Sequence, residues 1–213
     1  GLPLGKFGMA FGLMPYSAVG YKNENTVEST EGTRYFRSQG NGFINKVFVG
    51  GSYTFNDNLS FGLDFAYHFG DITNEFTEKA LSPELTQYTT REKNTTELNG
   101  VSFNIGLLYN RQINSKLTFH SSLTYSPESK LSTTNFRNIA TVVYTIDGTE
   151  LSNDDEDINL PNKELTIPSR LSLGFGLGEN KKWLLGSELT FTQNKNLVNR
   201  FTELTQVSYE NST

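Results

Sequence analysis

The sequence predicts an all-β fold, a transmembrane antiparallel up-and-down β-barrel to which this chain contributes about eight strands. Apolar residues alternate with small or polar residues in one segment after another. The most apolar stretch, Phe7 to Tyr21, covers about 15 residues and contains Pro15, whereas a membrane-spanning helix needs roughly 20. Tight turns also alternate with long polar segments, as they do in outer-membrane barrels.

Each predicted strand has one apolar face and one small or polar face. The clearest case runs from Leu59 to Phe69, where every odd position is aliphatic or aromatic and the even positions include Gly62, Asp64 and His68. A two-residue period indicates a strand, and this segment is long enough to cross a bilayer at a tilt. The same pattern predicts strands, in chain order, at 6–16, 42–55, 59–69, 99–113, 117–126, 164–178, 183–193 and 200–213.

The connections between these strands are of two kinds. Tight turns are predicted at Asn56–Asn58, at Asn114–Ser115 and at Glu179–Lys181, and such turns lie on the periplasmic side of outer-membrane barrels. The long polar segments 17–41, 71–98 and 127–163, and the residues from Gln193 onward, are predicted to be extracellular loops. Within the third loop, residues 131–148 also alternate. They are predicted to form a strand extension or a hairpin above the membrane, because another spanning strand would upset the parity of the turns.

A soluble β-sandwich is the alternative fold, because its strands alternate in the same way. The polar face of a sandwich meets water and usually carries many Lys and Glu residues, whereas here Gly, Ser, Thr, Asn and Ala dominate. The apolar face carries no charge in these strands, as contact with lipid requires. Aromatic residues near the strand ends fit interfacial girdles, namely Tyr16, Phe55, Phe69, Tyr109, Tyr125, Trp183 and Phe191. These patterns favour the barrel.

Composition excludes several classes of function. The net charge is −5 and the basic residues are scattered, so nucleic acid is not an expected partner. The chain has no cysteine, which excludes a disulfide framework and a thiolate metal site. It has only two histidines, His68 and His120, and no catalytic spacing. We therefore expect no enzymatic activity, no metal and no cofactor.

The order of these hairpins resembles the FadL-type family of long-chain fatty-acid and toluene transporters. The segments that carry the resemblance are the opening Phe7–Tyr16, the pair Val47–Phe55 and Leu59–Tyr67, the pair Val101–Tyr109 and Lys116–Tyr125, and the pair Leu165–Gly176 and Lys182–Phe191. The resemblance implies a fourteen-stranded barrel with an N-terminal plug. Residues 1–213 would then be one partial barrel domain without the plug and the last strands; a complete eight-stranded barrel is the alternative.

The inner face of the predicted barrel is poor in charge. Small residues such as Gly50 and Gly106 leave volume there, and the predicted ligand-lining residues are Met14, Lys46, Phe48, His68 and Leu108. Lys46 and His68 could hold a carboxylate head group. The alternatives are that the glycines relieve crowding in the strands, that a plug fills the lumen, and that Lys46 pairs with Asp64. The acidic run 153–157 is expected to be a solvated loop, with a divalent-cation site as the alternative.

Two functions follow from these predictions, both in the outer membrane of a Gram-negative bacterium. The first is passive transport of hydrophobic or amphipathic molecules such as fatty acids, as the FadL resemblance implies. The second is a structural or docking subunit of a larger outer-membrane assembly, for example a secretion system, which the large polar loops support. The expected partners are membrane lipid, lipopolysaccharide and a hydrophobic small molecule, joined in the docking alternative by other outer-membrane proteins.

Overall fold

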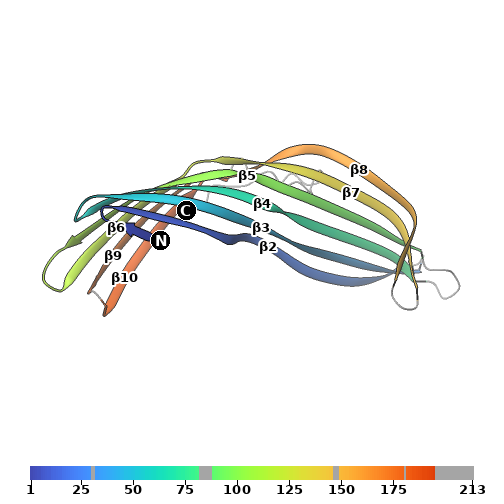
Figure 1. Ribbon diagram of the computed structural model, residues 1–213. Coiled ribbons are helices and arrows are strands. Elements are labelled where there is room, and N and C mark those ends of the chain that lie inside the picture. Colours follow the sequence, from blue (N-terminus) through green and yellow to red (C-terminus); the bar gives the residue numbers. More distant parts are fainter. Residues whose placement is uncertain (30–31, 82–87, 146–148, 180, 195–213) are drawn as a thin grey trace.

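The chain forms one antiparallel sheet of ten strands (Figure 1). The computed structural model describes residues 1–29, 32–81, 88–145, 149–179 and 181–194. The strands are β1 (Leu2–Leu4), β2 (Phe7–Ser29), β3 (Gly32–Asn56), β4 (Leu59–Leu81), β5 (Thr89–Gln112), β6 (Leu117–Ser126), β7 (Ser129–Tyr144), β8 (Glu150–Ile167), β9 (Arg170–Glu179) and β10 (Trp183–Thr192). No helix among these residues could cross a membrane.

The sheet curls into half of a barrel. Its strand order is β1-β2-β3-β4-β5-β6-β9-β10, with β7 paired to β5 and to β8. In Figure 1, β2 to β5 run the length of the molecule, β6, β9 and β10 occupy one end, and β7 and β8 occupy the other. The predicted all-β antiparallel class is therefore confirmed, whereas a closed barrel that spans a membrane stays a prediction.

The β7–β8 hairpin is a continuation of β6 and β9 rather than a separate motif. Only Pro127 and Glu128 separate β6 from β7, and only Pro168 and Ser169 separate β8 from β9. The register is the same on both sides of these breaks, since Ser126 lies opposite Arg170 and Ser129 opposite Ile167. Proline has no amide proton to donate to the ladder, so the pairing is interrupted there without a change of direction. The predicted strand extension at 131–148 is confirmed as far as Tyr144, and residues 146–148 lie outside the described part of the chain.

The predicted strands are confirmed, but the long connections were wrongly predicted to be loops. Residues 17–29 and 32–41 belong to β2 and β3, and residues 71–81 and 89–98 belong to β4 and β5. These stretches lack an apolar face, which made them look like loops in the sequence. They form strands because pairing with a neighbour satisfies their backbone N–H and C=O groups whatever the side chains are. The strand predicted at 200–213 lies outside the described residues.

We divide the sheet into two halves. The barrel half comprises residues 7–16, 42–70, 99–126 and 170–192, whose strands meet in the tight turns. The extended half comprises residues 17–41, 71–98 and 129–167, as far as they are described. The turns are confirmed where predicted: Asn56 and Asn114 each accept two backbone N–H groups, from Asn58 and Leu59 and from Lys116 and Leu117, at 2.8–3.0 Å.

Odd positions share one face of the barrel half from β2 to β10. Odd residues lie opposite odd residues in the pairings between these strands, for example Leu13 opposite Val47 and Val47 opposite Tyr67, apart from the irregular end pair Asn56 and Leu59. The predicted division into odd and even faces is thus confirmed. Large apolar side chains of the odd face are well exposed, including Phe11, Leu13, Val49, Phe65, Phe103, Phe175, Leu185 and Leu189. We call this surface the apolar band.

A glycine bend joins the two halves. Gly42 and Gly70 have φ angles of 143° and 148°, which disfavour any residue with a Cβ atom. A Cβ atom on Gly70 would also lie 2.0 Å from the carbonyl oxygen of Phe43. Beside this bend lies the apolar core of the molecule, formed by buried Ile44, Leu98 and Leu131 with Ile72, Leu165 and Ile167 around them. Both strands can therefore turn sharply while they stay paired.

We predict that Gly70→Ala in the full-length protein lowers its stability by about 2–4 kcal/mol, from backbone strain and from overpacking against β3. Thermal unfolding of the purified protein followed by circular dichroism measures the change. Gly51→Ala is the matched control, because a Cβ atom there meets nothing within 4 Å. Equal melting temperatures for the two variants would contradict the role assigned to the bend.

Candidate functional site

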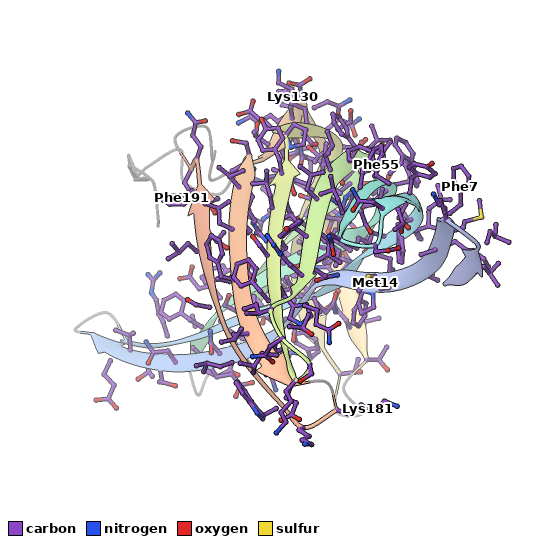
Figure 2. All side chains as sticks on the ribbon, turned by 90° about the vertical axis from the view of Figure 1, so that its left-hand side faces the viewer. Phe7, Met14, Phe55, Lys130, Lys181 and Phe191 are labelled. Carbon is purple, nitrogen blue, oxygen red and sulfur yellow. The ribbon has the colours of Figure 1, made fainter. Side chains whose placement is uncertain are left out.

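A hollow lies along the even face of the barrel half. Its volume is about 680 Å³, and its walls include Gly8, Ala10, Met14, Lys46, Phe48, Gly50, Gly62, Asp64, Asn104 and Gly106. Figure 2 shows the coiling of the sheet around this region, since the strand that carries Phe191 stands nearly upright while the strand that carries Phe7 and Met14 runs nearly across it. Glycine creates the space because it has no side chain to fill it.

Three of the five predicted lining residues, Met14, Lys46 and Phe48, meet in this hollow. The Lys46 ammonium lies 6.0 Å from the centre of the Phe48 ring, a cation–π distance. Asp64 is not paired with Lys46: its carboxylate accepts a hydrogen bond of 2.8 Å from Asn104. The alternative of a Lys46–Asp64 ion pair is therefore wrong.

The other two predicted lining residues lie elsewhere. His68 is opposite Lys46 in the register, but it is 2% exposed. Its Nε2 atom is 2.8 Å from the Ser102 hydroxyl, and the Tyr16 ring meets the imidazole edge-on. Leu108 lines a separate hollow of about 350 Å³ near His120 and Leu184. The five residues do not form one continuous slot, and a ligand at any of them stays a prediction.

The part of the extended half that lies away from the glycine bend buries the opposite face of the sheet, whereas Leu98 and Thr133 next to the bend are still buried on the even face of β4. Ala66 and His68, at even positions of β4, are buried in the barrel half, whereas the odd residue Thr77 is buried further along the same strand. Thr89 on β5 and Val142 on β7 lie opposite each other on that same face and are also buried. Because long twisted strands rotate their faces, the surface that is exposed in the apolar band turns inward in the extended half.

A polar network holds this second interior together. The Arg91 guanidinium on β5 forms an ion pair with Glu150 on β8 and donates a 2.7 Å hydrogen bond to Asn138 on β7. The Tyr144 hydroxyl donates to the same Glu150 carboxylate at 3.1 Å. Burial raises the pKa of Tyr144, the Glu150 carboxylate adds to this effect, and Arg37 on β3 opposes it. Arg37 and Tyr144 therefore interact although β4 and β5 separate their strands.

Ion pairs neutralise the other face of the extended half. Arg34 lies 2.7 Å from Glu78, and Arg137 lies 3.1 Å from Glu92. The Phe36 and Phe76 rings stack between these strands with their centroids 6.1 Å apart. This face presents aromatic rings and charges that are already paired, and sequence reasoning missed it because these stretches were assigned to loops. The residues between 89 and 98 are nearly all Thr, Asn or charged and show no two-residue period, so no local strand signal was available there.

The acidic run was also misassigned. Residues 153–157 lie in the middle of β8 and not in a loop. Asn138 donates hydrogen bonds to both Asp155 and Asp157, the latter at 2.8 Å. No group of three or more potential metal ligands occurs among the described residues, so the geometry gives the cation alternative no support.

Comparison with known families overturns the resemblance described above. The family model that matches is BamG, and it covers residues 1–213, the whole chain. The assignment to the FadL-type transporters is therefore wrong, and with it the inference of passive fatty-acid transport. Hairpins of alternating Gly and aromatic residues are shared by unrelated barrels, so their order misled the assignment. No curated protein matches the chain, and no solved structure matches it.

We predict that Arg91→Ala lowers the free energy needed to open the β7–β8 hairpin by about 2 kcal/mol. The substitution leaves the Glu150 carboxylate and Asn138 without their charged donor. Amide hydrogen exchange in β7 and β8 should accelerate while exchange in the barrel half stays unchanged. Lys130→Ala is the control: its ion pair with Glu164 is exposed on both sides and is worth little. Unchanged hydrogen exchange in β7 and β8 of the Arg91 variant would contradict a stabilising role for the contacts of Arg91 with Glu150 and Asn138.

Proposed function

The chain belongs to the BamG family, and on this premise we propose that it is a non-enzymatic docking subunit of the β-barrel assembly machinery in the Gram-negative outer membrane. Membership of the family over residues 1–213 is the observation that carries the proposal. It favours the docking alternative over transport, and it points to other outer-membrane proteins as partners.

In this proposal the barrel half anchors the subunit in the lipid bilayer. The apolar band supports the anchoring role: Phe11, Leu13 and Leu185 are 70%, 68% and 74% exposed, a degree of exposure that is costly in water. No charged residue occupies an odd position within Val47–Phe55 of β3 or Leu59–Phe69 of β4. A lipid-facing wall needs this kind of surface, because a charge at the bilayer midplane costs several kcal/mol.

The extended half then supplies the docking surface. Its strands pass beyond the apolar band, and its side chains are dominated by polar and charged groups. Its internal network and paired β-ladder keep it rigid without an apolar face, and a preorganised surface binds a partner at a lower entropic cost. The two histidines of the chain are engaged by Ser102 and Asn110 within the barrel wall, which supports a non-enzymatic role.

The proposal predicts that the affinity-tagged full-length protein, extracted from its own outer membrane in mild detergent, retains other subunits of the assembly machinery in fixed ratio. Depletion of the protein should also lower the amounts of other outer-membrane barrels. An unrelated tagged outer-membrane barrel of similar abundance is the control for the capture. Recovery of the protein alone, together with unchanged barrel levels after depletion, would rule the function out.

The membrane anchor is tested at Phe65, which lies in the apolar band and is 48% exposed. Phe65→Arg should destabilise the folded protein in lipid vesicles by about 2–4 kcal/mol, because the guanidinium would enter hydrocarbon. Phe65→Leu keeps an apolar side chain at this position and should stay near the wild-type value. Urea unfolding from vesicles measures both, and equal stability of the two variants would place this surface outside the bilayer.

A further inference from the structure

The extended half has two open edges among the described residues, β2 on one side and β8 on the other. From Ala10 to Ser29, β2 pairs only with β3, and β8 pairs only with β7 over Glu150–Ile167. An open edge presents a row of backbone N–H and C=O groups that can pair with a further strand. The two edges differ in their charge.

The β2 edge carries a smaller net charge than the β8 edge, since its Lys22 offsets one of its two glutamates. Lys22 and Glu24 on β2 form an ion pair of 2.8 Å. On β8, Glu150 and Glu164 have basic partners, but the four consecutive carboxylates from Asp154 to Asp157 have no ion-pair partner among the described residues. Charge on an edge strand can serve merely to repel other strands. Four adjacent carboxylates also repel one another, and a partner of opposite charge would relieve that repulsion.

A hollow adjoins this edge on one face. Its volume is about 410 Å³, and Arg91, Lys93, Thr95, Phe136, Asn138 and Asp157 line it. Phe136 is 41% exposed there. Arg91 is already bound to Glu150, whereas Lys93 adds a positive charge to the wall of the hollow. The hollow therefore offers the Phe136 ring to the apolar stem of an incoming side chain, and the carboxylates of the edge, rather than the wall that carries Lys93, attract its cationic end.

We propose that the β8 edge accepts a basic, extended segment of a partner protein as an added β-strand. This inference rests on the proposed function and names the surface that the docking subunit uses. Backbone hydrogen bonds to β8 would supply sequence-independent affinity, and the carboxylates would select the partner. Asp154 and Glu156 lie on one face of the sheet, opposite Thr141 and Ile139, whereas Asp155 and Asp157 lie on the other.

This arrangement sets the chemistry of the partner segment. Cross-strand neighbours share a face, so a segment that neutralises all four carboxylates must place cations on both of its faces. It therefore carries consecutive Lys or Arg residues rather than alternating ones. Residues 195–213 of this chain are a poor match, because their Lys195 and Arg200 are balanced by Glu203 and Glu210.

The test uses the tagged full-length protein in its own outer membrane. The edge variant combines Asp154→Asn, Asp155→Asn, Glu156→Gln and Asp157→Asn, which keeps shape and removes charge. We expect capture of at least one subunit to fall at least tenfold, and wild-type capture of that subunit to weaken as salt rises. Phe136→Ser should weaken capture of the same subunit several-fold. Glu24→Gln with Glu28→Gln on the β2 edge is the matched control and should leave capture unchanged.

A photo-crosslinking residue at Asn153 or Asn159 identifies the occupant, with Thr26 on β2 as the control position. A crosslinked peptide from a second protein with consecutive basic residues would support the inference. Crosslinks only within the same chain, or only to lipopolysaccharide, would overturn it. The two proposals can fail independently. If the wild-type protein captures no other subunit, the proposed function is contradicted. If a well-folded edge variant captures its subunits as fully as the wild type, only the β8 site is contradicted. Hydrogen exchange of β7 and β8 checks that the variant is folded.

Discussion

Lateral backbone pairing in a single register is the constraint on which the whole structure depends. From β2 to β10 the barrel half places odd residues opposite odd residues, and a slip by one residue would move every apolar side chain to the other face. The same ladder satisfies the backbone in stretches that have no apolar face. Because the ladder does not require an apolar face, the strands extend far beyond the apolar band. One sheet therefore forms both the apolar band and the polar extended half.

The two halves are stabilised by different forces because they bury different faces. Around the glycine bend, Ile44, Leu98 and Leu131 form an apolar core. Beyond it, the buried positions include Thr77, Thr89 and Val142, and charged groups such as Arg91 are held by specific partners. Burial of polar groups costs free energy unless hydrogen bonds compensate for lost hydration. The terminal nitrogens of Arg91 are compensated by Glu150 and Asn138, whereas the buried hydroxyls of Thr77 and Thr89 have no hydrogen-bond partner among the described residues. The stability of the extended half therefore depends on a few specific polar contacts, whereas that of the barrel half depends on the alternation of apolar residues.

This difference explains how much could be predicted from the sequence. The strands of the barrel half and their tight turns were predictable, since a two-residue period and Asn-rich turns are local signals. The extended strands were not predictable, because their polar and charged residues follow no two-residue period, and partners such as Arg91 and Glu150 are far apart in the chain. Met14, Lys46 and Phe48 could be grouped from parity alone. Parity could not show that Leu108 sits in another hollow, because position along the barrel axis depends on strand tilt and register.

The distribution of charge gives a physical reason to regard the extended half as the working part of the molecule. Inside the barrel half, Lys46 lies over Phe48 and Asp64 is held by Asn104, so its few charges have local roles. On the face of the extended half that lies opposite its interior, Arg34 and Arg137 are paired with glutamates. The carboxylates from Asp154 to Asp157 have no ion-pair partner among the described residues, although Asn138 donates hydrogen bonds to Asp155 and Asp157. Adjacent charges that the fold does not neutralise are explained most simply by a partner that does. The exposed β8 edge of the sheet, rather than the hollow in the barrel half, therefore presents charged groups that a partner can bind.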